Sequence, residues 1–121
     1  MKTNLIFAIF AVLFFAQSAH ASVTTGKVVR TYVLLNCPAA GQPPCSTGIV
    51  TLNTPNTSPP ACSLIHTEWA FALDTAAGKA MFNAILHAQA VGATATVVGD
   101  GTCGAWPDRE RPSYMYFTYP Q

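Results

Sequence analysis

Residues 76–91 form the one segment of the chain with helical periodicity, whereas the other regular segments have the short length and composition of β-strands. Asp74 or Thr75 can cap the start of this helix, and Gly92 can end it. The predicted apolar stripe recurs at three- and four-residue steps: Ala77, Met81, Ala84, Ile85 and Ala88. Its many alanines make the helix slim enough to lie close against a sheet or a neighbouring subunit.

Five segments rich in β-branched and aromatic residues predict strands. They are residues 26–35, 48–52, 69–73, 93–98 and 114–119. In the third segment, Trp69, Phe71 and Leu73 alternate with alanines, which is typical of a strand whose bulky face fills a core. In the first segment, strict alternation places four side chains on a common face: Val28, Arg30, Tyr32 and Leu34. The order of three strands, one helix and two strands predicts a mainly β chain with one helix, β-β-β-α-β-β.

The first 21 residues have the pattern of a cleavable export signal. Lys2 gives a positive start, an apolar run of 12 residues follows at 5–16, and Ala19-x-Ala21 matches the small-residue site of a signal peptidase. The apolar run is shorter than the roughly 20 residues that a spanning helix needs. We therefore expect a signal peptide at 1–21, a mature single domain at 22–121, and a secreted or periplasmic location without a membrane span. A retained N-terminal anchor is the alternative.

All four cysteines, Cys37, Cys45, Cys62 and Cys103, follow this signal. An even number of cysteines in an oxidising compartment predicts two disulfides, and three pairings are open. We favour Cys37–Cys45, because the Pro- and Gly-bearing segment between them can fold back on itself, with Cys62–Cys103 as the second bridge. A zinc site completed by two histidines is the rival interpretation. The absence of a CxxC pair and the oxidising compartment disfavour it, so we expect no metal.

Charge and size exclude several classes of protein. Residues 22–121 carry five basic and five acidic side chains, so the chain lacks the basic patch of a strongly electrostatic nucleic-acid binder. Half of the chain is apolar, which argues against disorder. One domain of this size leaves no room for separate cofactor and substrate domains, and we expect no cofactor.

The chain has no clear catalytic set. No Gly-x-Ser-x-Gly elbow accompanies His66 or His87. Asp108 and Glu110 alternate with two arginines, and we interpret this run as self-neutralising surface charge rather than a glycosidase pair. The connector at 53–60 has no apolar side chain to bury and is expected to be a plain loop. The sequence therefore predicts a protein that is not an enzyme, and a hydrolase that uses either histidine is a distant alternative.

Trp106 marks the best candidate for a binding site. It lies in a Pro-bounded loop and is followed by Asp108 and Arg109, so a flat ring stands beside hydrogen-bonding charges. Such a ring packs on the C–H face of a sugar while the charges bind hydroxyls, and the same features suit a protein-binding hot spot. A purely structural cover is the other interpretation. Tyr114 and Tyr116 share one side of the last strand and either extend this patch or build core.

The segments GIVTL, WAFAL, TATVVGDGTC and WPDRERPSYMYF, together with the helix, resemble small exported bacterial proteins of unknown function. In element order these resemble the OB-fold binding subunits of bacterial AB toxins, which form rings and recognise host glycans. Cys62, Cys103, Trp69 and the turn at 101–103 carry the likeness. The resemblance implies a small five-stranded OB-like barrel that acts as a binding module, and the slim helix offers a surface for a homo-oligomer.

These observations predict a secreted, disulfide-bonded binding module that recognises a glycan or a protein, with Trp106, Asp108, Arg109, Tyr114 and Tyr116 as its binding residues. The alternative is a small secreted inhibitor or a structural envelope protein. Such a protein would insert the Pro-rich loop between Cys37 and Cys45 into its partner and bind no carbohydrate.

Overall fold

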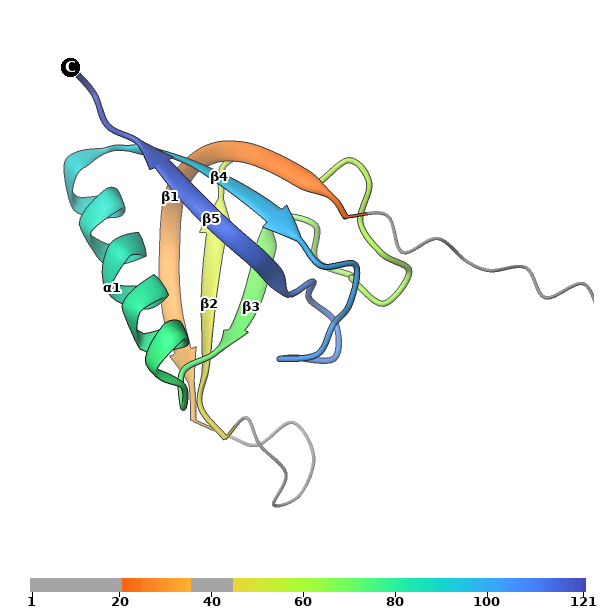
Figure 1. Cartoon of the computed structure of the whole chain (residues 1–121). Coiled ribbons are helices and arrows are strands. Elements are labelled where there is room, and N and C mark those ends of the chain that lie inside the picture. The colour runs from red at the N-terminus through yellow and green to blue at the C-terminus, as the bar shows by residue number, and fades with distance from the viewer. Residues whose placement is uncertain (1–20, 36–44) are drawn as a thin grey trace, which may run out of the picture.

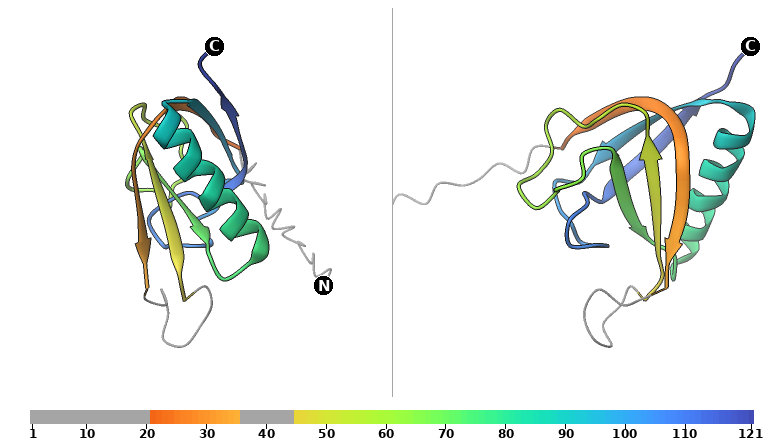
Figure 2. Two further views of the ribbon diagram at one scale, coloured as in Figure 1. Left: turned by 90° about the vertical axis from the view of Figure 1, so that its left-hand side faces the viewer. Right: turned by 180° about the vertical axis from the view of Figure 1, so that it is seen from behind.

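The computed structural model describes residues 21–35 and 45–121. Its elements follow the order β1 (Val23–Leu34), β2 (Thr47–Leu52), β3 (Glu68–Ala72), α1 (Ala76–Val91), β4 (Thr94–Gly99) and β5 (Pro112–Thr118). The strands form one open sheet in the order β3-β2-β1-β4-β5, with every neighbouring pair antiparallel. The sheet lies between α1 on one side and the β4–β5 loop on the other (Figures 1 and 2). The prediction of a mainly β chain with its helix between the third and fourth strands is confirmed.

Strand β1 is long and strongly bent, and it joins the two halves of the sheet (Figure 1). Its first half pairs with β4, from Val23 with Val98 to Lys27 with Thr94, and its second half pairs with β2. The register shifts by one residue between Val28 and Arg30. A bulge of this kind bends a strand and increases its local twist.

The bulge also corrects the expected arrangement of β1. Val28 lies in the core on the helix side, whereas Arg30 and Tyr32 lie on the loop side, where they pair with Thr51 and Ile49 of β2. Strict alternation placed all these β1 side chains on one face. That prediction is wrong because the extra residue at the bulge reverses the facing of every side chain after it.

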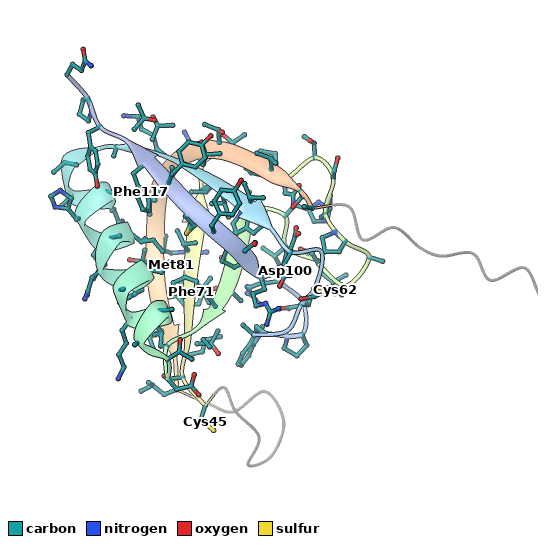
Figure 3. The ribbon with its side chains drawn as sticks, viewed as in Figure 1. Cys45, Cys62, Phe71, Met81, Asp100 and Phe117 are labelled. Carbon is teal, nitrogen blue, oxygen red and sulfur yellow. A yellow bond between two sulfur atoms is a disulfide. The ribbon has the colours of Figure 1, made fainter. Side chains whose placement is uncertain are left out.

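The main core lies between the sheet and α1. It contains Val28, Val50, Leu52, Trp69, Phe71, Ile85, Ala95 and Val97. Met81 of the helix and Phe117 of β5 pack against this cluster, and Figure 3 shows Met81 and Phe71 between the helix and the sheet. The expected core face of the third strand, Trp69 and Phe71, is therefore confirmed.

Helix α1 begins and ends where the sequence predicts. The Thr75 hydroxyl accepts a hydrogen bond from the Gly78 amide, and Gly92 ends the helix in the left-handed conformation with a φ of 69°. The buried positions are Gly78, Ile85 and Ala88. Gly78 permits a close approach, since a Cβ there would lie 1.6 Å from the Ala72 carbonyl oxygen. Ala77, which the stripe predicted to face the core, is exposed instead.

A disulfide within the described residues links the β2–β3 connection to the β4–β5 loop. Cys62 and Cys103 are bonded to each other with a Cα–Cα distance of 6.1 Å, as predicted. Cys45 is also disulfide-bonded, and its predicted partner Cys37 lies outside the described residues. Figure 3 places Cys45 at one end of β1 and β2, away from Cys62. In the described part of the chain, no helix combines the length and apolar character needed to cross a membrane.

Candidate functional site

The β4–β5 loop, residues 100–111, is closed at its base by short-range polar contacts. Arg111 Nε donates to Asp100 Oδ2 at 2.5 Å, and the Thr102 amide and hydroxyl donate to Asp100 Oδ1 at 2.8 and 2.7 Å. The largest single influence on Asp100 is burial, which raises its pKa, but the bonds from Thr102 and Arg111 outweigh burial and leave the pKa lowered. The Cys62–Cys103 bridge joins the same loop to the β2–β3 connection. The loop is thus held at both its base and its middle.

The tip of this loop packs on the sheet face opposite the helix. Ala105 is buried there with Ile49 and Ala70, and Trp106 packs against the same small cluster. Thr47 Oγ1 donates to the Ala105 carbonyl oxygen at 3.3 Å. The half-buried Trp106 therefore covers the outer face of β2 and β3 and keeps part of its surface in solvent.

A buried carboxylate, Glu68 at the start of β3, organises the charges next to Trp106. Its side chain is 4% exposed and accepts a hydrogen bond from Arg30 Nη2 at 2.6 Å and from Arg109 Nε at 2.6 Å. The hydroxyl of Tyr32 donates to Oε2, the oxygen that Arg109 also binds, at 2.7 Å, and Thr51 Oγ1 donates to Oε1, the oxygen that Arg30 binds, at 3.3 Å. We call these five residues, from four different parts of the chain, the Glu68 cluster.

Electrostatics in the Glu68 cluster favour an ionised Arg109, an ionised Glu68 and a neutral Tyr32. Burial alone raises the pKa of Glu68, but hydrogen bonds from Tyr32 and Arg109, with the charge of Arg109, lower it overall. Burial and the bond to Glu68 raise the pKa of Tyr32. Burial lowers the pKa of Arg109, but the bond to Glu68 and the nearby negative charges raise it overall. The cluster is thus a stable charged network at neutral pH.

Three members of this cluster, Arg30, Tyr32 and Arg109, lie next to Trp106 and Asp108 of the β4–β5 loop. We call these five residues the loop surface. Arg109 pairs with Asp108 and is 12% exposed, whereas the Arg30 side chain is 63% exposed. The Arg30 guanidinium carbon lies 5.3 Å from the centroid of the Tyr32 ring, within the range of a cation–π contact. Aromatic rings therefore stand beside exposed hydrogen-bonding groups of both signs.

The structure brings together three of the five predicted binding residues. Trp106 and Arg109 pair through a backbone bridge, and Asp108 lies between them in the chain and pairs with Arg109. Tyr114 and Tyr116 lie elsewhere, on the outward face of β5. Within residues 21–35 and 45–121, no hydrogen bond, ion pair or ring contact joins those two tyrosines to Trp106.

The outward face of β1, β4 and β5 forms a second surface, which we call the tyrosine face. Val23, Val98 and Tyr114 lie side by side across the three strands, and Thr25, Thr96 and Tyr116 form the next row. Tyr114 and Tyr116 are each 53% exposed, so they do not build core. They extend a surface of their own rather than that of Trp106.

The charged run at 108–111 is only in part the self-neutralising surface that its sequence suggested, because Asp108 and Arg109 pair but the other partners lie outside the run. Arg109 reaches Glu68 across a separation of 41 residues, and Glu110 is 1% exposed. Arg111 pairs with Asp100 at the base of the loop. Local alternation of signs predicted pairing within the run, and Asp108 and Arg109 do pair in this way. The other contacts lie outside the run, because successive side chains of an extended segment point to opposite sides and meet different partners.

Three residues of the site, Arg30, Tyr32 and Glu68, were not anticipated. The sequence contained a signal for Glu68 alone. This acidic residue directly precedes the segment predicted to be a buried strand, at 69–73, and a buried charge needs partners. Nothing in the local pattern indicated that the partners come from β1 and from the β4–β5 loop.

Neither histidine enters the site. His66 is exposed in the β2–β3 connection, and His87 on α1 lies with its ring centroid 5.6 Å from that of Tyr119. Among the described residues, no group of three or more His, Cys, Asp or Glu side chains could hold a metal ion. The predicted binding site therefore rests on the loop surface.

Comparison of the chain with protein-family models, with curated proteins and with solved structures found no match.

Proposed function

We propose that this protein is an exported, disulfide-bonded binding module, that its sheet is an OB-like barrel, and that a glycan or a protein docks on the loop surface. The observation that carries the proposal is the position of Trp106. The ring is half-buried over β2 and β3, and the same loop carries Asp108 and Arg109, which Glu68 links to the exposed Arg30.

The closeness of β3 and the start of β5 supports the barrel. These elements lie at opposite ends of the strand order, yet Trp69 and Glu110 form a parallel bridge, and the Ala70 amide donates to the Glu110 carbonyl oxygen at 3.0 Å. OB-folds are five-stranded, partly open barrels. A sheet whose outer strands approach over one bridge fits that description.

The place of the loop surface supports a ligand site. OB-folds bind oligosaccharides and oligonucleotides on the face of strands 2 and 3 and on the loops that join strands 1–2 and 4–5. Trp106 and Arg109 stand in the loop between β4 and β5; Trp106 packs over β2 and β3, and Arg109 binds Glu68 of β3. Arg30 and Arg109 are balanced by Glu68 and Asp108, so this surface has no excess of positive charge with which to attract a phosphate backbone. A neutral glycan or a protein fits better.

The side chains divide into two roles. Trp106 and Tyr32 offer ring faces for the C–H surface of a sugar or the apolar centre of a protein epitope. Arg30 and Asp108 offer an exposed donor set and an acceptor for hydroxyl groups. Arg109, fixed by Glu68 and Tyr32, positions the loop that carries Trp106.

A glycan array with the protein beginning at Ser22 tests this assignment. Because a truncated hot-spot aromatic costs about 2 kcal/mol or more, Trp106→Ala should weaken binding at least about 30-fold. The matched control is the double variant Tyr114→Ser/Tyr116→Ser, which alters an aromatic surface on β5 and should bind like the wild type. Circular dichroism and intact mass verify that each variant is folded and oxidised.

Two results would contradict the proposal. Unchanged binding by Trp106→Ala removes the loop surface as the site, and binding lost only in the tyrosine double variant moves the site to β5. If no glycan on the array binds, but a purified protein partner binds the wild type and not Trp106→Ala, then the ligand is a protein.

A further inference from the structure

Glu110 is a buried carboxylate whose hydrogen-bond partners are all neutral. It is 1% exposed and lies just before β5. Its side chain accepts hydrogen bonds from Ser22 Oγ at 2.5 Å, from Asn56 Nδ2 at 2.8 Å and from the Gly101 amide at 3.0 Å. None of the four ion pairs formed within the described ranges includes Glu110. A buried carboxylate ordinarily has a cationic partner or a metal, because removing its charge from water is costly.

The packing holds this carboxylate in place. A Cβ added to Gly99 would lie 1.9 Å from Glu110 Oε1, so the carboxylate rests directly on the Gly99 backbone. Asn56, from the connector that was expected to be a plain loop, is itself buried and donates to both Ser22 Oγ and Glu110. The carboxylate therefore has little room to turn towards solvent.

Ser22 is the residue that would become the N-terminus. It follows Ala19-x-Ala21, the predicted signal-peptidase site, and is 1% exposed, whereas Ala21 is exposed. The Gly99 amide donates to its carbonyl oxygen at 2.8 Å, which fixes its backbone next to β4. The nitrogen and Oγ of a serine are three bonds apart, about 3 to 4 Å. With Oγ at 2.5 Å from Glu110 Oε2, the Ser22 nitrogen lies within about 6 Å of the carboxylate.

We propose that cleavage between Ala21 and Ser22 creates the cation that Glu110 lacks. In the uncleaved chain the Ser22 nitrogen is a neutral amide. A signal peptidase adds water across the Ala21–Ser22 bond, which leaves a carboxylate on Ala21 and an ammonium group on Ser22. This ammonium then pairs with the buried Glu110 carboxylate and fastens the start of β1 to the β4–β5 connection.

This inference rests on the export that we propose above, but not on any ligand. Its consequence is that processing stabilises the folded domain. The processed chain should be more stable than a chain of the same fold in which the Ser22 nitrogen is still part of an amide, because the latter keeps a buried charge without an opposite charge.

The N-terminus of the exported protein is the first test. The full chain is expressed with residues 1–21 in a host that exports it, and the product is examined by intact mass and N-terminal sequencing. We expect a chain that begins at Ser22 and contains two disulfides. A chain that begins at any other residue overturns the pairing and leaves the proposed ligand site untouched.

A double-mutant cycle on the mature protein is the second test. One arm compares the chain that begins at Ser22 with a chain that keeps Ala21 and is acetylated, which restores an amide at Ser22. The other arm makes the same comparison in Glu110→Gln. Since breaking a buried pair is strongly destabilising, the amide should raise the unfolding equilibrium constant at least about tenfold with Glu110 present, and less than about twofold with Gln.

Asp74→Asn serves as the matched control background, because Asp74 is an exposed acid that contacts neither residue. The acetylated extension should have its full effect there. An equal effect in the Glu110 and Glu110→Gln chains overturns the proposal, and so does no effect with Glu110 present.

Amine labelling keeps the proposal testable even if Glu110→Gln does not fold. The mature wild-type protein is treated with an amine-acylating reagent at neutral pH, and peptides are quantified by mass spectrometry. Exposed Lys27 and Lys79 should react readily. The Ser22 amine should react at least about tenfold more slowly in the folded than in the denatured protein, and equal rates overturn the ion pair.

Discussion

Substitution of Glu68 by Gln should destabilise the fold more than the loss of an ordinary surface acid. The variant keeps the shape of the side chain but removes the negative charge at the centre of the Glu68 cluster. Arg109, which is 12% exposed, would keep only Asp108 as a counter-ion. Arg30, which is 63% exposed, would turn into solvent at little cost.

The expected magnitude follows from these exposures. Breaking a buried ion pair costs about 3–5 kcal/mol, and the lower end applies here because one of the two guanidinium groups is solvated and the other keeps a second acid. We expect a loss of about 3 kcal/mol in the free energy of unfolding, which corresponds to a fall of more than about 10 °C in Tm for a domain of this size.

The assay is guanidinium-chloride unfolding at a series of pH values, with Asp74→Asn as the control. The pKa of Glu68 is lower in the folded chain than the 4.5 of the free side chain. Its ion pairs therefore stabilise the fold fully above about pH 4.5, and this contribution is lost as the pH falls through the folded pKa. The difference between wild type and Glu68→Gln should be largest near pH 7 and shrink in acid. A difference below about 1 kcal/mol at pH 7, or a difference independent of pH, would show that the charge of Glu68 does not stabilise the fold in this way.

Two further changes test the packing of the domain. Replacing both Cys62 and Cys103 by Ser removes a disulfide between residues 41 positions apart in the sequence. Chemical denaturation should then show a free energy of unfolding lower by about 4 kcal/mol, and a loss below about 1 kcal/mol would contradict this. Gly78→Ala stabilises an isolated helix by about 1 kcal/mol, but its Cβ would lie 1.6 Å from the Ala72 carbonyl oxygen. Because overpacking costs about 3 kcal/mol, the variant should have a lower free energy of unfolding than the wild type. The measurement is thermal unfolding, and a Tm of the alanine variant equal to that of the wild type would contradict this expectation.

The helix was predictable because its signals are local. Thr75 and Gly92 stand at its ends, and the apolar repeat lies between them, so the observed bounds match the expected ones. The exposed Ala77 and the buried Gly78 could not be foreseen, because the stripe was inferred from apolarity, whereas the close approach of the helix to Ala72 requires the smallest residue.

The candidate site was predictable only in part, because the contacts that stabilise it join residues far apart in the sequence. The sequence around Trp106 indicated an aromatic ring in a loop beside charges, and the structure places Trp106, Asp108 and Arg109 together in the β4–β5 loop. The carboxylate that organises those charges, Glu68, meets its partners across separations of 38 and 41 residues. A one-residue bulge in β1 decides that Arg30 reaches it at all, and a bulge leaves no recognisable pattern in the sequence.

We propose that the ligand binds beside Trp106, and the two tryptophans of the chain allow a direct measurement of its position. Trp69 is 1% exposed in the main core, whereas Trp106 keeps part of its ring in solvent at the loop surface. In a 15N-labelled sample titrated with a glycan selected on the array, the indole N–H resonance of Trp106 should shift in proportion to occupancy while that of Trp69 stays in place. Saturating binding that leaves the Trp106 resonance unmoved, or that moves only the backbone resonances of Tyr114 and Tyr116, would contradict the account.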